Sequence, residues 1–197
     1  GTFDSKSNTL SIQVSEDEIW TLQFSIHNSV VVLNSFSVEM PAITVRYEFN
    51  QEGRPGTITY TASGSTGAIY FQYDEAGKQI GTIQIQSNPD GGRIDFTIDN
   101  PVAMTRNSGS IYLPKESADE ILAQSHSWDE LITLIDELMV VKTIEQFSNQ
   151  ELTHWTGTVE YVKENGAFVL KKVMNQEGTF IIDSAGNPIR FRDPFQW

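Results

Sequence analysis

The segment from Ser117 to Met139 constrains the fold most, because it is the one clearly helical stretch in a chain that otherwise alternates like β-strands. On a helical wheel that starts at Trp128, the apolar and polar side chains separate into two arcs. The apolar arc contains Leu131, Ile132, Leu134, Ile135, Leu138 and Met139, and the polar arc contains Asp129, Glu130, Thr133, Asp136 and Glu137. Such an apolar arc must be buried against another element. Predicted strands flank the segment on both sides, so we expect it to pack on a β-sheet.

Two capping-box patterns divide this segment, since Ser117 precedes Glu120 and Ser127 precedes Glu130 at the required spacing. They predict a short helix from about Ala118 to Gln124, a break at residues 125–127, and a main helix from Trp128 to about Met139. The pattern leaves open whether residues 140–147 extend the helix or begin a strand.

Alternating apolar and polar residues predict short strands over most of the remaining chain. Residues 20–26 alternate without a fault, which is typical of a strand with one buried face. On this parity Trp20 is assigned to the core. The apolar run Val30–Leu33 is too short to classify. Turn signals separate the strands about every ten residues, and Asn88–Gly92 is the strongest of them.

These patterns predict a mainly-β (β-rich α+β) protein, in which an antiparallel meander forms a sandwich or half-barrel with one amphipathic helical segment packed on it. A length of 197 residues fits a single domain, residues 1–197. Within it we expect a polar, frayed start over residues 1–8 and an N-terminal meander over residues 8–113. The helical segment covers residues 117–139, and C-terminal strands cover residues 153–192.

The formal net charge of −13 argues against binding to duplex nucleic acid, which requires a basic surface. Residues 111–151 contain nine acidic and two basic residues, a net charge of −7. The acidic helix face, formed by Asp129, Glu130, Asp136 and Glu137, is therefore either a partner-facing surface or a solvated face that keeps the chain soluble. The sequence has no run of 18 apolar residues, so we expect no transmembrane segment.

No motif commits the chain to a cofactor, a metal or a catalytic mechanism. The absence of cysteine excludes disulfides and thiolate chemistry. The histidines His27, His126 and His154 lack metal-ligand spacing, and His126 is expected to be a turn residue. Asp90 lies in an ordinary tight turn rather than in a calcium loop of the EF-hand type. We therefore expect no cofactor, no metal site and no identifiable catalytic residue.

Two sets of residues nevertheless remain candidates for a functional site. Asp95 and Asp99 share one face of a predicted strand, and paired carboxylates are what a glycosidase requires. Tyr70 has the opposite parity to Ile69 and Phe71 and is expected to face outward. An outward Tyr70 beside Tyr60 would form a ligand-binding platform of aromatic rings.

The chain begins at Gly1 without a leader, contains no cysteine, and combines a meander with one amphipathic helix. In these respects it resembles the small β-rich secreted or lipoprotein-type domains of unknown function found in Gram-negative bacteria. This resemblance implies an extracytoplasmic location, in the periplasm, at the outer surface or secreted, with room for a lipid anchor upstream of the chain. The expected function is a non-catalytic binding or interaction domain for a protein or glycan partner. The alternative is a hydrolase, such as a carbohydrate-active enzyme with a carboxylate-based site.

Overall fold

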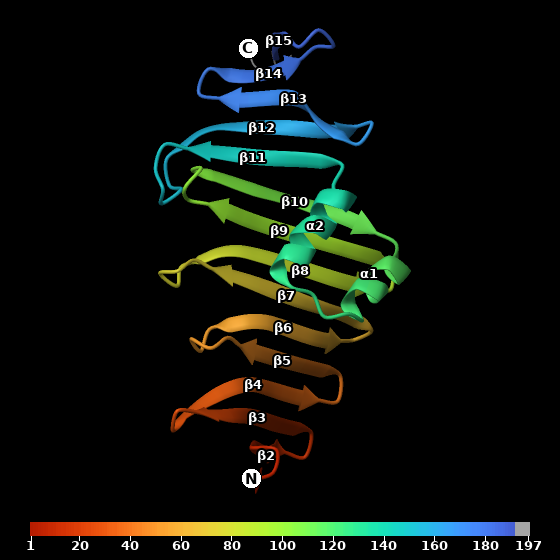
Figure 1. Ribbon diagram of the computed structural model, residues 1–197. Coiled ribbons are helices and arrows are strands. Elements are labelled where there is room, and N and C mark those ends of the chain that lie inside the picture. The colour runs from red at the N-terminus through yellow and green to blue at the C-terminus, as the bar shows by residue number, and fades with distance from the viewer. Residues whose placement is uncertain (192–197) are drawn as a thin grey trace. The chain divides into compact units, whose positions relative to one another are not determined.

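The computed structural model describes residues 1–191 and has a mainly-β fold with two helices, α1 (Lys115–Leu122) and α2 (Trp128–Leu138). The strands are β1 (Thr2–Asp4), β2 (Thr9–Ser15), β3 (Glu18–His27), β4 (Val30–Met40), β5 (Ile43–Phe49), β6 (Pro55–Ala62), β7 (Ser65–Tyr73), β8 (Gln79–Asn88), β9 (Gly91–Asn100), β10 (Thr105–Leu113), β11 (Val141–Phe147), β12 (Trp155–Glu164), β13 (Ala167–Asn175), β14 (Gly178–Ile182) and β15 (Pro188–Phe191). They form one open antiparallel sheet, in which the strand order follows the chain (Figure 1). The predicted mainly-β antiparallel meander is confirmed. The expected sandwich of two sheets is wrong, because all the strands pair in sequence within a single sheet.

The chain divides into two compact units. The first comprises Gly1–Ile94 and Tyr112–Trp128, and the second comprises Asp95–Ile111 and the chain from Asp129 onward. Helix α1 therefore belongs to the first unit, and all of α2 except Trp128 belongs to the second.

In the first unit, one face of β2–β7 carries two cross-strand rows without a charged side chain. The first row is Leu10, Leu22, Phe36, Tyr47, Ile58 and Ile69; the second is Ile12, Trp20, Val38, Val45, Tyr60 and Gly67. We call this surface the uncharged face. Because side chains alternate along a strand, the intervening residues point to the other side of the sheet.

The other side, which we call the helix-side face, changes from polar to apolar along the same strands. Its first row is Ser11, Thr21, Ser37, Arg46, Thr59, Ala68 and Ile85; its second is Thr9, Gln23, Ser35, Glu48, Thr57, Tyr70 and Ile83. Hydroxyl, amide and charged groups dominate from β2 to β6, and apolar side chains dominate on β7 and β8. This transition decides where α1 can pack.

Helix α1 packs on β7 and β8, at the apolar end of the helix-side face (Figure 1). Ala68, Ile83, Ile85 and Ala118 are all buried there. Hence the buried core of the first unit lies beneath the helix, on the side of the sheet opposite to the uncharged face.

In the second unit, α2 buries the apolar arc that its sequence predicts. Leu131, Ile135 and Met139 are almost inaccessible to solvent, whereas the five residues of the polar arc are exposed. Lys163 on β12 donates hydrogen bonds from Nζ to the carbonyls of Asp136 and Glu137, at 2.6 and 3.0 Å. These bonds satisfy carbonyls in the last turn, which lack partners within the helix. Within residues 1–191, neither helix is long and apolar enough to cross a membrane.

Three turns share one geometry that the sequence analysis did not recognise. They are Asn50–Arg54, Asp74–Lys78 and Asp183–Asn187. In each, the backbone N–H of the first residue donates to the carbonyl of the fifth, and the side-chain Oδ1 of the first accepts from the N–H of the fifth. The fourth residue is a glycine with φ between 76 and 84°. The recurring sequence Asx-x-x-Gly therefore specifies this turn, because Asx caps it and glycine accepts the left-handed φ.

Several predicted boundaries differ from the observed elements. Residues 2–4 were expected to be frayed but pair with β2 as a strand. Helix α1 begins at Lys115, after an N-cap at Pro114 that makes no side-chain capping bond, so the first predicted capping box is wrong and Ser117 lies inside the helix. Pro114 itself has a non-helical ψ of 148°, and the helix starts at the residue after it. The run at Val30 belongs to β4, and residues 141–147 form β11.

The assignment of Trp20 to the core is also wrong. Trp20 lies on the uncharged face and keeps 37% of its surface exposed. Its parity with Leu22 and Phe24 was predicted correctly, but the core of this unit forms on the other side of the sheet. Residue 192, where the C-terminal strands were expected to end, lies outside the described residues.

Candidate functional site

A cleft of about 340 Å³ lies in the first unit, where the polar part of the helix-side face meets the end of α1. Its strand residues are Glu48, Thr57, Thr59, Gly67, Ala68 and Tyr70, and its remaining wall is the segment Leu122–His126. The volume is near the lower end of the range for small-molecule sites. We call this the Tyr70 cleft.

The floor of the Tyr70 cleft comes from adjacent positions on three strands. Glu48, Thr57 and Tyr70 are consecutive members of one cross-strand row, and Thr59 faces Ala68 in the neighbouring row. Neighbouring strands lie about 4.8 Å apart, so these side chains converge on a ligand-sized area. The next residue in the Tyr70 row is Ile83, which is fully buried, so the cleft borders directly on the core.

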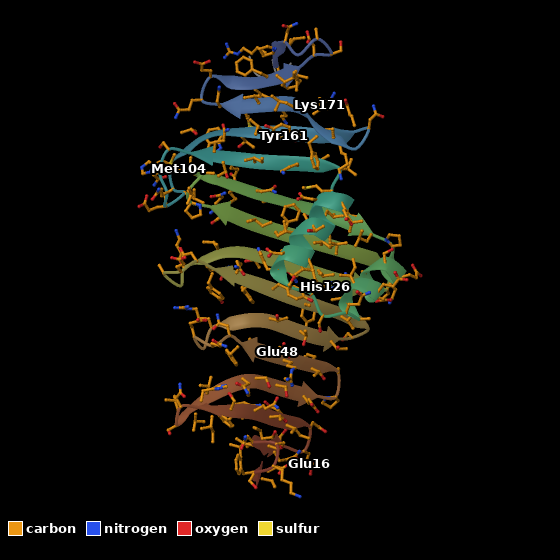
Figure 2. All side chains as sticks on the ribbon, in the orientation of Figure 1. Glu16, Glu48, Met104, His126, Tyr161 and Lys171 are labelled. Atoms are coloured by element: carbon orange, nitrogen blue, oxygen red, sulfur yellow. The ribbon has the colours of Figure 1, made fainter. Side chains whose placement is uncertain are left out.

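The wall of the cleft is the segment that follows α1. The helix ends at Leu122, and its C-cap is Ala123. The chain then turns, and His126 Nε2 donates a hydrogen bond to the carbonyl of Ile121 at 2.8 Å. This bond holds the segment against the last turn of the helix. Figure 2 shows Glu48 on β5 and His126 beyond α1, the two labelled residues that line the cleft from the sheet and from the helix end.

Burial raises the pKa of Tyr70 above its ordinary value, and the charge of Glu48 contributes to the same rise. Glu48 remains exposed and forms an ion pair with Arg46, whose Nε lies 3.2 Å from Oε1. The ordinary pKa of 10.0 already keeps a tyrosine protonated near neutral pH, and the rise acts in the same direction. The Tyr70 hydroxyl can therefore both donate and accept hydrogen bonds.

This set of groups suits a polar ligand that also has an apolar face. Tyr70 offers a half-buried ring, Thr57 and Thr59 offer hydroxyls, and Glu48 offers a carboxylate. Glu48 is the one carboxylate among the lining residues, whereas glycoside hydrolysis generally uses two carboxyl groups about 5–9.5 Å apart. The geometry therefore supports recognition of a ligand better than its hydrolysis.

The two tyrosines proposed for one platform lie on opposite faces of the sheet. Tyr70 is on the helix-side face, and Tyr60 is on the uncharged face, where its hydroxyl accepts a hydrogen bond from Gln84 Nε2 at 3.2 Å. Tyr70 does have the opposite parity to Ile69 and Phe71, as expected. It faces the helix rather than bare solvent, because α1 covers the side that carries Ala68 and Tyr70.

The remaining candidate residues do not contribute to the Tyr70 cleft. Asp129, Glu130, Asp136 and Glu137 are exposed on α2 in the second unit, where they form the polar side of that helix.

Asp99 forms a two-point contact with Arg106, with Nε–Oδ1 at 2.6 Å and Nη2–Oδ2 at 3.1 Å, and Ser110 donates to Asp95 at 2.5 Å. Asp95 and Asp99 are four residues apart on β9, and four residues along a strand span about 13 Å. That separation is too large for a catalytic carboxylate pair.

Sequence reasoning did not identify Glu48, Thr57, Thr59 or His126 as site residues. The strand residues are brought together by the pairing register of β5, β6 and β7, which the alternation of each strand does not reveal. His126 was expected to be a turn residue; it does follow a helix end, but the turn also closes the cleft. Over residues 1–191, no group of three or more His, Cys, Asp and Glu side chains is arranged to hold a metal ion.

No protein-family model matches this chain, and none of the curated proteins compared with it does. Among solved structures, the chain is similar to a protein of unknown function from Bacteroides fragilis NCTC 9343. The identity is 10%, the match covers 80% of this chain and 91% of that protein, and the TM-score is 0.20. At that TM-score the likeness carries no argument about fold or function.

Proposed function

We propose that this chain is a non-catalytic binding domain that holds a neutral saccharide unit in the Tyr70 cleft. The observation that carries the proposal is the convergence of a half-buried tyrosine ring, two threonine hydroxyls and one carboxylate beside the end of α1. Sugars combine an apolar ring face with a rim of hydroxyls. An aromatic ring with surrounding donors and acceptors is complementary to both features.

We also propose that the domain acts outside the cytoplasm. The absence of cysteine and the strands rich in threonine, serine, asparagine and glutamine support this location. Glycans are abundant partners on that side of the membrane, so the proposed location and the proposed ligand are consistent with each other.

The test is a thermal-shift screen of the purified chain against neutral mono- and oligosaccharides. A saccharide present at about 100 times its dissociation constant stabilises the fold by roughly 2.7 kcal/mol, which corresponds to several degrees of Tm. Tyr70→Ala should abolish the shift, and Tyr60→Phe, on the opposite face, should leave it unchanged. Each variant is compared with its own ligand-free Tm, so a lower intrinsic stability does not obscure the result.

A shift that survives in Tyr70→Ala, or that disappears in Tyr60→Phe, would place the ligand elsewhere. If no saccharide shifts the Tm, the saccharide assignment is wrong. The same screen distinguishes the hydrolase alternative, because a hydrolase would convert the oligosaccharide during incubation and a binding domain would return it intact.

A further inference from the structure

The uncharged face of β2–β7 has no part in the proposed saccharide site. Its two rows cross six strands, and every member of them is apolar, aromatic or glycine. Among residues 1–191, α1 is the helix of the first unit, and it lies against the opposite side, which carries Ala68 and Ile85. A sheet with one apolar face normally buries that face against a second layer.

The aromatic rings on the uncharged face pack against one another. Trp20 meets Phe36 edge to face, with ring centroids 5.7 Å apart, and Phe36 stacks with Tyr47 at 6.2 Å. Tyr60 lies across Gly67 on the adjacent strand, in the space that a Cβ would occupy. The rings thus fill the gaps between side chains.

We propose that this surface is an interface between two copies of the chain, packed face to face. Charge permits this occupant: each copy has a formal net charge of −13, but none of it lies on the two rows. The charged side chain beside them is Glu18 at the start of β3, whose carboxylate already accepts a hydrogen bond from Trp20 Nε1 at 2.6 Å. The same rows on both copies form a self-complementary contact, as a two-fold dimer requires. Two aligned sheets packed about 10 Å apart would provide the missing layer.

The area of this side of the sheet matches what a stable dimer needs when the row beside the uncharged face takes part. Six strands about 4.8 Å apart, with about seven residues each at about 3.3 Å per residue, give a footprint of roughly 650 Å². Standard protein interfaces bury about 600–1,000 Å² on each partner. The two rows occupy about four of those seven residues on each strand. The flanking row with Met40, Ile43 and Ala62 contributes to the rest.

The test is the mass of the full chain in solution, measured by sedimentation or light scattering over a concentration series. The proposal predicts twice the 22.1-kDa chain mass at high concentration. Val45→Lys places a charge on the uncharged face of each copy and should raise the dissociation constant at least about a hundredfold. Thr44→Lys is the matched control, since Thr44 is the neighbouring residue on β5 and faces the other side of the sheet. Added salt should strengthen the dimer, because it screens the repulsion between two acidic copies.

Trp20→Lys is a second disrupting variant. Because Trp20 is partly exposed, a lysine there should disturb folding of the single chain less than one at Val45. Circular dichroism checks that each variant is folded. Dimers in wild type and Thr44→Lys, with monomers in folded Val45→Lys or Trp20→Lys, would support the proposal. A wild-type chain that is monomeric throughout would overturn it, as would a dimer that survives both disrupting substitutions. A monomeric wild type that floats with phosphatidylcholine vesicles, when Val45→Lys does not, would also overturn the proposal. That result would identify a lipid surface as the occupant.

Discussion

The hydroxyl of Ser87 on β8 donates a hydrogen bond to the carboxylate of Asp119 on α1, with 2.5 Å between the oxygens. Lys115, one turn earlier on the helix, forms an ion pair with the other carboxylate oxygen at 2.6 Å. Ser87 is only 1% exposed, so its hydroxyl depends on this partner. The contact joins the helix that walls the Tyr70 cleft to the strand beneath it.

This contact predicts a pH dependence of stability. The hydrogen bond from Lys115, followed by that from Ser87, lowers the pKa of Asp119 below its ordinary value of 3.8. A lowered folded-state pKa means that the contribution is fully present above the unfolded value and is lost as the pH falls through the folded value. We expect the Tm of the wild type to exceed that of Asp119→Asn near neutral pH, and the difference to shrink below about pH 4. Thermal unfolding followed by circular dichroism at several pH values measures this, and a constant difference would contradict it.

A charge introduced at Ile135 should lower the free energy of unfolding far more than the loss of the charge at Asp136. Ile135 is 2% exposed in the middle of the apolar arc of α2, whereas Asp136 is exposed. We expect Ile135→Asp to lower the free energy of unfolding by at least about 3 kcal/mol, because it buries an unpaired carboxylate. Asp136→Ala should change it by less than about 0.5 kcal/mol. Urea denaturation of the two variants tests the packing of α2, and equal midpoints would show that the packing is wrong.

The Asx-x-x-Gly turns predict a cost for a side chain at the glycine position. Gly53 and Gly77 have φ of 76 and 80°, and a Cβ at Gly53 meets no atom within 4 Å. We therefore expect Gly53→Ala to cost about 1 kcal/mol through backbone strain alone. Gly77→Ala should cost more, because the Arg54 side chain lies across Gly77 and also stacks on the Tyr73 ring at 5.7 Å. Equal losses in urea unfolding would mean that the Arg54 contact adds nothing.

Tyr60 and Gly67 should be energetically coupled, since the tyrosine ring fills the space above the glycine. In the wild type, Gly67→Ala is expected to destabilise the sheet, because a Cβ would displace the ring. In a Tyr60→Ala background the same substitution should stabilise by about 0.5–1 kcal/mol, which is the usual cost of glycine within a strand. A double-mutant cycle measures the change of sign, and an identical effect in both backgrounds would show that the ring does not protect the glycine.

Much of the fold could be predicted from local periodicity. The alternation at Trp20–Ile26 lies within β3. The apolar arc from Leu131 to Met139 is the buried side of α2, with Met139 directly after the helix end. Both could be predicted because strand and helix periods are properties of the local chain. The start of α1 could not be placed in the same way. Pro114 begins the helix earlier than the capping pattern at Ser117 indicates, and the two signals compete within one turn.

The side of the sheet that becomes the core, and with it the site, could not be predicted. Parity shows that Tyr70 and Ile69 face opposite ways, but not which of them α1 will cover. That outcome depends on the register that aligns Ala68 with Ile85 and Tyr70 with Ile83. Glu48 and His126 are 78 positions apart in the sequence, and only the docking of α1 beside the polar rows makes them line one cleft.

The most direct test of the central claim is a nuclear magnetic resonance titration of the chain with its tyrosine rings labelled. The sequence contains six tyrosines, so the spectrum is simple, and the signal that is missing in Tyr70→Phe identifies Tyr70. With the saccharide that gives the largest thermal shift, we predict that the Tyr70 ring signal moves and saturates while the Tyr60 signal stays in place. A titration in which Tyr70 does not move, or in which Tyr60 moves instead, would contradict the assignment of the cleft as the binding site.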